Sequence, residues 1–404
     1  MSPINRREFA GVTLALSLAA RSLPGAVKLD NTMRTAMNRR KIPAAVAMAA
    51  TADKTVYEGA FGKRDSASDV DVTTGSIFRI ASMTKAITTV AAMQLVERGT
   101  LTLDEPVSRH LPELGKLEVL EGFDNSGKPI LHPAGKPVTL RLLLTHTAGF
   151  AYDGWDEKLS RYAQHAGPAA SVTPLVFEPG TRWEYGTNID WTGRLVEGVS
   201  GETLEAYFQR NILQPLGMKD TGFSVPAEKF DRLVSSYQRQ RDGSLKENPR
   251  TLPAPPKSFN GGGGLVSTAG DYVRFMQMIL RRGLTSGKER ILQAKTVDAM
   301  ASNQTGDLRA GILKSVNLER SRDVDFHPGF SDRFGFGFLI NTTAYEGGRS
   351  AGSLAWAGIQ NTFFWIDPRR GVCGVLLMQF LPFCDEEAIG LLHDFERSVY
   401  ASLK

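Results

Sequence analysis

A serine and a lysine three residues apart are the first candidates for chemistry. Ser82 and Lys85 stand in the segment FRIASMTKAITTVAAMQLVERG, at the start of a run typical of a helix. Residues three apart share a helix face, so the Lys85 amine can reach the Ser82 hydroxyl. A serine hydroxyl attacks carbonyl carbons well only when a base takes its proton, and a desolvated lysine can be that base. The spacing therefore predicts a nucleophile for ester or amide cleavage.

The Ser-x-x-Lys spacing is a loose signal by itself. A chain of 404 residues should contain it about once by chance, and this chain contains it once. In the alternative interpretation, Ser82 caps the helix and Lys85 is a solvated charge. The neighbouring residues Ile80, Ile87 and Val90 are apolar, which predicts a buried helix in which a lysine needs a function.

Ser350 is the competing nucleophile. The segment Gly348–Gly352 reads G-R-S-A-G and matches the G-x-S-x-G pattern of a strand–turn–helix nucleophile. That pattern requires a strand before the serine and a helix directly after it. The serine instead lies in EGGRSAGS, and a β-rich run follows it. We interpret Ser350 as a loop residue.

The surrounding elements must position the serine and lysine. Strand-like runs occur near both chain ends, at residues 44–50, 55–62, 334–340, 361–366 and 371–378. The middle is mostly helical in pattern, with loops expected at 123–137 and 253–264. Further helices are predicted at 29–39, 267–281 and 386–400. Thr268 is the expected cap of the second of these. A sheet assembled from both ends around an inserted helical region is an α+β architecture, with a small-molecule cleft expected between the two parts.

Several longer segments, in order along the chain, resemble one family. They are the block around Ser82 and Lys85, then LLLTHTAGF, FEPGTRWEYG, GGGGLVSTAGDYVRF and WAGIQNTFFWIDP. Together they resemble the serine β-lactamase-like superfamily, in its class C β-lactamase-related branch, and are most similar to the family VIII carboxylesterases. The resemblance implies a β-lactamase/transpeptidase-like fold: an antiparallel sheet flanked by helices, plus a mainly helical subdomain within about 90–300 of a single catalytic domain, 27–404.

The resemblance also implies catalytic roles. Ser82 corresponds to the acylated nucleophile, Lys85 to its partner, and Tyr185 to the tyrosine that relays protons between the serine and the leaving group. Tyrosine has a reference pKa near 10, so it acts as a base only where a cation such as Lys85 stabilises the phenolate. The alternative is that Tyr185 is a packed aromatic beside Trp183.

A further implied feature is the oxyanion hole. It would consist of the backbone N–H groups of Ser82 and Ile359, the latter following the triplet Trp356-Ala357-Gly358. Donors fixed in this way stabilise a tetrahedral intermediate. We therefore expect Ser82, Trp356, Gly358 and Ile359 to form the oxyanion and substrate-binding set.

The chain departs from the β-lactamase pattern in two places. Lactamases have a Tyr-x-Asn triplet, whereas this chain reads Tyr185-Gly186-Thr187, with Asn188 one position late. Their Lys-Thr-Gly triplet is replaced by Trp356-Ala357-Gly358. The missing lysine normally helps to bind a substrate carboxylate. An aromatic residue suits a neutral acyl or alcohol group better, so the sequence favours an esterase over a β-lactamase.

The charge distribution and the placement of histidines argue against nucleic-acid binding and against a metal site. The 48 basic and 43 acidic residues are interspersed, which is unlike a nucleic-acid-binding protein. The six histidines show no paired metal-ligand spacing, so neither metal nor other cofactor is expected. His146 is interpreted as a core histidine, and Gly261–Gly264 as a backbone turn near the site. Cys373 and Cys384 are interpreted as core or free thiols, with a bridge between them as the alternative.

The N-terminal segment has the form of an export signal. Residues 1–26 contain the pair Arg6-Arg7, a mildly apolar stretch from Ala10 to Ala20 and then small residues, which resembles the twin-arginine type. A membrane span needs about 20 apolar residues, so no stable membrane anchor is expected. We expect a periplasmic or secreted protein. The alternative is a cytoplasmic protein with a helical N-terminus.

The sequence thus predicts a serine hydrolase that cleaves carboxylic esters through an acyl-enzyme on Ser82. Its expected partner is a small-molecule ester or amide. The alternatives are a β-lactamase, a D-amino-acid peptidase or an acyltransferase of the same fold, or a non-catalytic relative that binds acyl ligands or peptidoglycan fragments. The natural substrate depends on loops expected at 123–137 and 153–170, and the oligomeric state is left open.

Overall fold

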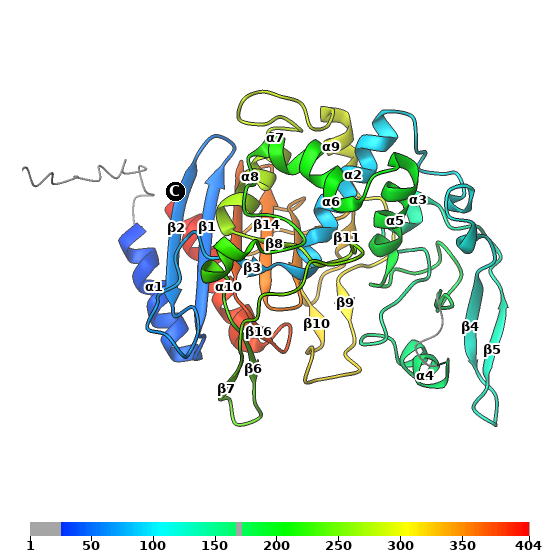
Figure 1. Cartoon of the computed structure of the whole chain (residues 1–404), viewed down its shortest axis with the longest axis horizontal. Coiled ribbons are helices and arrows are strands. Elements are labelled where there is room, and N and C mark those ends of the chain that lie inside the picture. Colours follow the sequence, from blue (N-terminus) through cyan, green and yellow to red (C-terminus); the bar gives the residue numbers. More distant parts are fainter. Residues whose placement is uncertain (1–25, 167–171, 404) are drawn as a thin grey trace, which may run out of the picture.

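The centre of the molecule is a seven-stranded antiparallel sheet, which joins the two ends of the chain (Figure 1). The computed structural model describes residues 26–166 and 172–403. Along the sheet the strands are β11 (Arg333–Phe334), β12 (Leu339–Ile340), β13 (Leu354–Gly358), β14 (Thr362–Asp367), β15 (Val372–Leu377), β1 (Ala44–Thr51) and β2 (Thr55–Gly62). The N-terminal β1 pairs with the C-terminal β15, with Val46 opposite Leu377. The predicted α+β fold of the β-lactamase/transpeptidase type is therefore confirmed.

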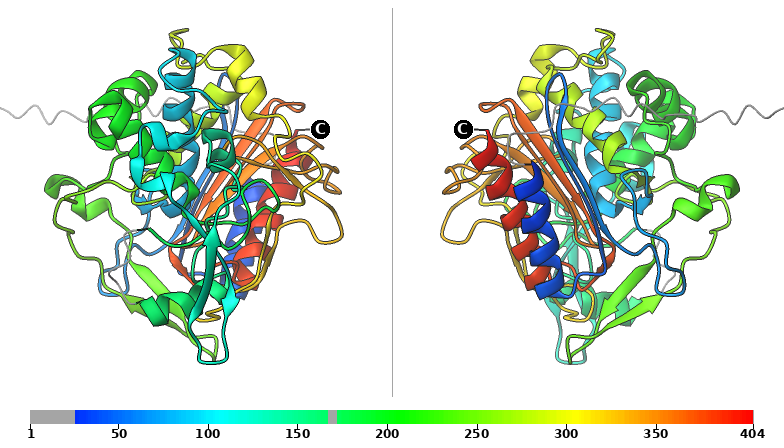
Figure 2. Two further views of the ribbon diagram at one scale, coloured as in Figure 1. Left: turned by 90° about the vertical axis from the view of Figure 1, so that its right-hand side faces the viewer. Right: turned by 90° about the vertical axis from the view of Figure 1, so that its left-hand side faces the viewer.

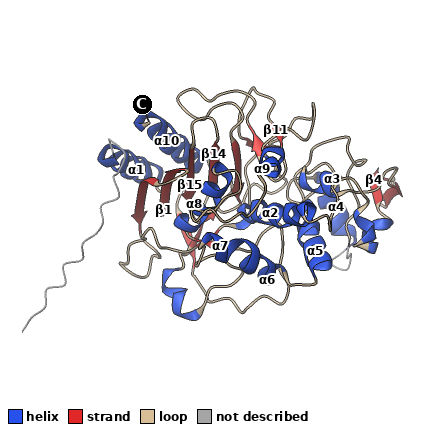
Figure 3. Ribbon diagram, turned by 90° about the horizontal axis from the view of Figure 1, so that it is seen from above, coloured by secondary structure: helices blue, strands red, loops and turns tan. Residues whose placement is uncertain are grey.

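Helices cover both faces of this sheet, which explains why its central strands are apolar throughout. Every residue of β14 and β15 is buried. Helices α1 (Ala26–Arg40) and α10 (Glu386–Ser402) lie side by side on one face (Figure 2). Helix α8 (Ala269–Leu280) packs on β15 and β1 from the other face (Figure 3). Burial of two apolar faces is the main stabilisation available to such a layered domain.

Local signals define where these helices begin. The Thr268 side chain accepts a hydrogen bond from the backbone N–H of Asp271, so it caps α8 as predicted. The Asp385 side chain accepts hydrogen bonds from the N–H groups of Glu387 and Ala388 at the start of α10. Such caps satisfy backbone donors that the first helical turn leaves free.

The remaining helices are grouped beside α8 and beyond it, away from α1 and α10 (Figure 3). They are α2 (Thr84–Glu97), α3 (Leu140–Leu144), α4 (Glu157–Ala166), α5 (Asn188–Ser200), α6 (Leu204–Phe208), α7 (Gln214–Leu216) and α9 (Ala294–Met300). Helix α2 is buried from Thr84 to Leu95 and packs on α5 and α6. This burial explains why α2 has no solvated polar face along these residues, and its buried Thr88 and Thr89 hydroxyls instead donate to backbone carbonyl oxygens.

Four small sheets lie outside the central one. Three are pairs: β3 (Phe78–Arg79) with β8 (Val266–Ser267), β4 (Glu118–Phe123) with β5 (Pro129–Pro133), and β9 (Ile312–Leu313) with β10 (Val324–Asp325). The fourth has β6 (Ser236–Arg239) between β7 (Leu245–Asn248) and β16 (Phe380–Leu381). Strand β3 lies directly before the segment that carries Ser82.

Three local predictions need correction. The loop expected at 123–137 is largely a hairpin, β4–β5, because Asp124 accepts hydrogen bonds from Ser126 and Lys128 and closes a tight turn. The segment 153–170 contains helix α4. The single strand expected at 334–340 is two short strands, because the chain turns back at Gly335–Phe338 and Gly337 adopts φ +80°.

Both cysteines are buried and free, so the interpretation as core thiols is confirmed and the bridge is excluded. Burial raises the pKa of Cys373 to about 12, which keeps it an unreactive thiol. Within residues 26–166 and 172–403, no helix combines the length and apolarity that crossing a bilayer requires. The export signal expected at residues 1–26 lies outside the described residues, except for Ala26.

Candidate active site

Ser82 lies in a short 3₁₀ helix, Ala81–Met83, that leads into α2. Ala81 has a positive φ of 44°, a conformation that is costly for a residue with a side chain. The strained turn leaves Ser82 partly exposed, while the following residues of α2 are buried. The serine is thus presented where the helical region meets the sheet.

Lys85 is the amine that contacts the serine. Its side chain is buried, with the residue 1% exposed. Its Nζ atom lies 3.2 Å from Ser82 Oγ, 3.2 Å from the Tyr152 hydroxyl and 2.6 Å from the carbonyl oxygen of Gly262. A neutral amine in this position would donate to Gly262 and Tyr152 and keep its lone pair for the Ser82 proton. The structure therefore brings Ser82 and Lys85 together as the spacing predicted.

Tyr152 and Asp190 complete a chain of hydrogen bonds that the sequence did not reveal. The Tyr152 hydroxyl donates to Asp190 Oδ2 at 2.9 Å and accepts from Lys85. Burial, with the charge of Asp190 as a smaller cause, raises the pKa of Tyr152 well above its ordinary value. This phenol stays protonated at neutral pH, so it orients the Lys85 amine rather than acting as a base.

A close backbone approach holds Asp190 in place. Asp190 lies in the first turn of α5, where the helix dipole favours a negative charge. A Cβ atom at Gly262 would overlap the Asp190 carboxylate, so only glycine allows this approach. The expected turn at Gly261–Gly264 thus lies beside the site and supplies an acceptor for Lys85. The feature of the sequence that indicated this turn is the run of four glycines.

Tyr185 lies on the other side of Lys85. It is 3% exposed, and its ring centre is 4.8 Å from Lys85 Nζ, so the amine faces the ring rather than the hydroxyl. Its hydroxyl has no hydrogen-bond partner among the described residues. Tyr185 and Ser82 line the same small space. An unpaired buried hydroxyl at this place is available to a substrate oxygen.

The end of β13 lies against the serine turn. A Cβ atom at Gly358 would overlap the carbonyl oxygen of Ile80, so glycine permits this contact. The next residue, Ile359, lines with Ser82 both the small space and a larger cavity of about 230 Å³. The ring of Trp356 packs on Tyr185, with centres 5.0 Å apart. The four residues predicted as the oxyanion and substrate-binding set therefore come together.

His146 and Asn188 belong to the supporting core. Asn188 is buried and donates to His146 Nδ1 at 3.0 Å and to the carbonyl oxygen of Phe150 at 3.1 Å. Burial, assisted by the charge of Lys85, lowers the pKa of His146 well below its ordinary value, so it is neutral and packs on Tyr185. The interpretation of His146 as a core histidine is confirmed. Asn188 thus bonds to the core, whereas Asp190 accepts the hydrogen bond of Tyr152.

Ser350 is not part of this site. Its backbone N–H donates to Asp367 Oδ2, and strand β13 follows four residues later. A nucleophile in a G-x-S-x-G motif needs a helix after it. The interpretation of Ser350 as a loop residue is confirmed.

The cavity of about 230 Å³ gives Ser82 an opening for substrate. Trp155 and Tyr152 form its aromatic side, and the exposed Arg320 lies at its rim. Other polar lining residues are Asp153, Asn260, Asn317 and Ser321. Within residues 26–166 and 172–403, no cluster of three or more His, Cys, Asp or Glu residues is placed to hold a metal ion.

Comparison with known proteins assigns the class. The family model described as β-lactamase matches residues 29–394, and the chain therefore belongs to the β-lactamase family, within the serine β-lactamase-like superfamily. It is 32% identical over 415 aligned residues to monacolin J acid methylbutanoyltransferase of Aspergillus terreus, covering 95% of this chain and 97% of that protein. It is 31% identical to lovastatin esterase of Penicillium rubens, covering 92% and 98%.

A solved structure shows the same arrangement of elements. Unliganded simvastatin synthase from Aspergillus terreus superimposes with a TM-score of 0.79 at 32% identity, covering 94% of this chain and 99% of that one. The two relatives above are named as a methylbutanoyltransferase and an esterase. This chain is therefore similar to enzymes that transfer or cleave acyl groups.

Proposed function

We propose that this protein is a serine hydrolase that cleaves carboxylic esters of small molecules through an acyl-enzyme on Ser82. The observation that carries the proposal is the chain of contacts from Ser82 through Lys85 and Tyr152 to Asp190. A neutral Lys85 amine that donates to Tyr152 and Gly262 would turn its lone pair towards the serine proton, which is the requirement for an activated nucleophile.

The first step is attack by Ser82 Oγ on the ester carbonyl carbon. The serine proton passes to Lys85, and the backbone N–H groups of Ser82 and Ile359 stabilise the oxyanion. Tyr185, whose hydroxyl has no partner in the described residues, lies where it can pass a proton to the departing alkoxide, and the proton held by Lys85 then restores the Tyr185 phenol. Water then attacks the acyl-enzyme by the reverse path and releases the acid.

The aromatic surroundings favour a neutral ester over a β-lactam. Trp356 occupies the place of the lactamase lysine and packs on Tyr185 and Trp183. An indole offers no charge to a β-lactam carboxylate but does offer apolar contact to an acyl group. We therefore expect ester turnover to exceed β-lactam turnover.

Acyl transfer to an alcohol is the second candidate activity. The relative from Aspergillus terreus is named as a methylbutanoyltransferase, and the alignment covers 95% of this chain. An alcohol bound in the cavity of about 230 Å³ would compete with water for the same acyl-enzyme. Product analysis with and without an added alcohol separates the two activities.

The test is hydrolysis of p-nitrophenyl acetate and butyrate beside a chromogenic cephalosporin. We expect ester cleavage that Ser82→Ala abolishes and Ser350→Ala leaves intact. Loss of activity in Ser350→Ala with retention in Ser82→Ala would disprove the assignment of the nucleophile. Mass spectrometry of the quenched protein should show the acyl group on the peptide that contains Ser82.

We also propose that residues 1–26 direct the protein out of the cytoplasm through Arg6 and Arg7. Fractionation of cells that express the wild type and an Arg6→Lys/Arg7→Lys variant tests this. Export of both to the same extent, or of neither, would contradict the twin-arginine assignment.

A further inference from the structure

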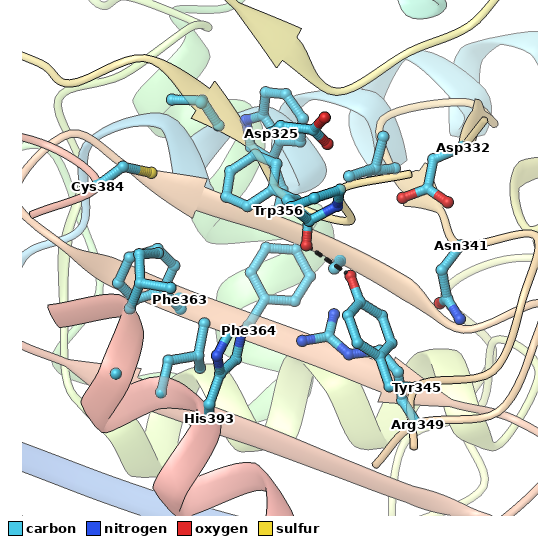
Figure 4. A pocket seen from close by; sticks show the side chains of 18 of the residues that line it. Asp325, Asp332, Asn341, Tyr345, Arg349, Trp356, Phe363, Phe364, Cys384 and His393 are labelled. Atoms are coloured by element: carbon cyan, nitrogen blue, oxygen red, sulfur yellow. Dashed lines mark hydrogen bonds between the residues drawn. The ribbon is translucent and has the colours of Figure 1, made fainter. Parts of the chain in front are cut away.

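A second cavity, of about 410 Å³, lies between the sheet and α10. Figure 4 shows Phe363 of β14 on one side of it and His393 of α10 below. Ala355 of β13 and Ile389 of α10 also face into it. Its volume is in the range typical of small-molecule sites, and its sheet side is aromatic and aliphatic.

Charged groups at the other end of this cavity are already paired. The Arg349 guanidinium is buried and donates to both carboxylate oxygens of Glu396. Asp332 Oδ1 lies 3.2 Å from His327 Nδ1. Because these charges are compensated, an uncharged chain fits the cavity better than an ion does.

Aromatic rings separate this cavity from the catalytic serine. Phe326 and Trp356 line both the 410 Å³ cavity and the small space at Ser82 and Tyr185. The Phe326 ring centre lies 6.0 Å from that of Trp356 and 6.4 Å from that of Phe383. Phe326 is thus one of two rings that lie in the walls of both spaces.

A hydrogen bond holds the backbone of Phe326, and the ring of this residue lies in the wall between the two spaces. The Tyr345 hydroxyl donates to the Phe326 carbonyl oxygen at 2.8 Å, which is the dashed line in Figure 4. The His327 ring is stacked on Tyr345 and on Phe330, with centres 4.1 Å apart in each pair. An opening movement is thus a change of side-chain rotamer, which costs far less than opening the segment.

We propose that the 410 Å³ cavity binds the distal part of the substrate's acyl chain, and that Phe326 is the gate between this cavity and Ser82. The inference rests on the proposed ester hydrolysis and adds its substrate class, esters of medium-chain aliphatic acids. The carbonyl carbon lies at Ser82, and the chain passes Phe326 and Trp356 to reach the space between Phe363 and α10.

The experiment compares kcat/KM for p-nitrophenyl octanoate and acetate. Each methylene that enters an apolar cavity is worth about fourfold. We expect Phe326→Ala to raise the octanoate-to-acetate ratio at least tenfold. Ala355→Phe, which fills the cavity, should lower this ratio tenfold and should cancel the gain in the double variant. Ala227→Phe, at an exposed position, is the control for adding a phenyl group.

Either of two outcomes would overturn the proposal: an unchanged ratio in Ala355→Phe, or a double variant that keeps the full gain of Phe326→Ala. Calorimetric binding of 1-octanol to Ser82→Ala, and its loss on adding Ile389→Trp, tests the cavity without turnover. Acetate hydrolysis that survives Ser82→Ala would refute the proposed function. Octanol binding would still show whether the cavity takes an aliphatic chain.

Discussion

Tyr152 donates its hydrogen bond to Asp190 at 2.9 Å and therefore offers only its oxygen lone pairs to Lys85, 3.2 Å away. The direction of this bond fixes the direction of the next one, because the Lys85 amine must donate to Tyr152 and to Gly262. The remaining side of the Lys85 nitrogen faces Ser82. Asp190 thus acts on the serine through two intervening groups.

Replacing Tyr152 by phenylalanine should reduce kcat/KM about 10- to 100-fold, because Lys85 loses the acceptor that orients its lone pair. The loss should appear mainly in kcat, with a shift of the acid limb of the pH–rate profile. Tyr207→Phe is the matched control, since the Tyr207 hydroxyl is also buried but has no partner among the described residues. Equal losses in the two variants would show that Tyr152 is merely structural.

Gly262→Ala should reduce both stability and activity. Its Cβ atom would overlap the Asp190 carboxylate, and forced packing of this kind costs about 1–3 kcal/mol. Chemical denaturation and ester kinetics measure the two effects. Gly270→Ala, in helix α8 with open space around the added methyl group, should instead be neutral or stabilise by about 0.5–1 kcal/mol.

Glu184 should make the folded protein less stable as the pH rises towards neutral. Burial raises the pKa of this carboxyl from 4.5 to about 7, against the opposing charge of Arg182. The folded state therefore binds the proton more tightly than the unfolded state, and its contribution is full below pH 4.5 and lost as the pH rises through about 7.

The rise of the Glu184 pKa from 4.5 to about 7 limits the change in the free energy of unfolding to roughly 3 kcal/mol. The measurement is the free energy of unfolding of the wild type and Glu184→Gln between pH 4.5 and 8. We expect Glu184→Gln to gain stability relative to the wild type as the pH increases. A constant difference between the two proteins would contradict the prediction.

Arg320→Ala should discriminate between anionic and neutral esters. Arg320 is exposed at the rim of the cavity that contains Ser82, where its guanidinium can meet a substrate carboxylate. We expect KM for a hemisuccinate ester to rise about three- to tenfold, with little change for the butyrate ester, as suits an exposed ion pair. Arg322→Ala, nearby but not in the lining, is the control. Parallel changes for both esters in Arg320→Ala would refute a charge-specific role.

The amino-acid sequence by itself determined the local parts of the site. The three-residue spacing of Ser82 and Lys85 fixes their contact as soon as the 3₁₀ turn and α2 form, because residues three apart share a helix face. The capping of α8 by Thr268 and the apolar runs of β1, β14 and β15 are equally local signals, and the structure has them at the predicted places.

Only the tertiary structure decided which distant groups meet at Lys85. Tyr152 is 67 residues away and Gly262 is 177 residues away along the chain, so no periodicity connects them to the lysine. The same applies to Asn188 and Asp190, which are two residues apart in α5 but face a core histidine and the catalytic cavity respectively. Packing of whole elements sets these contacts, and packing depends on the complementary shapes of surfaces that are far apart in sequence.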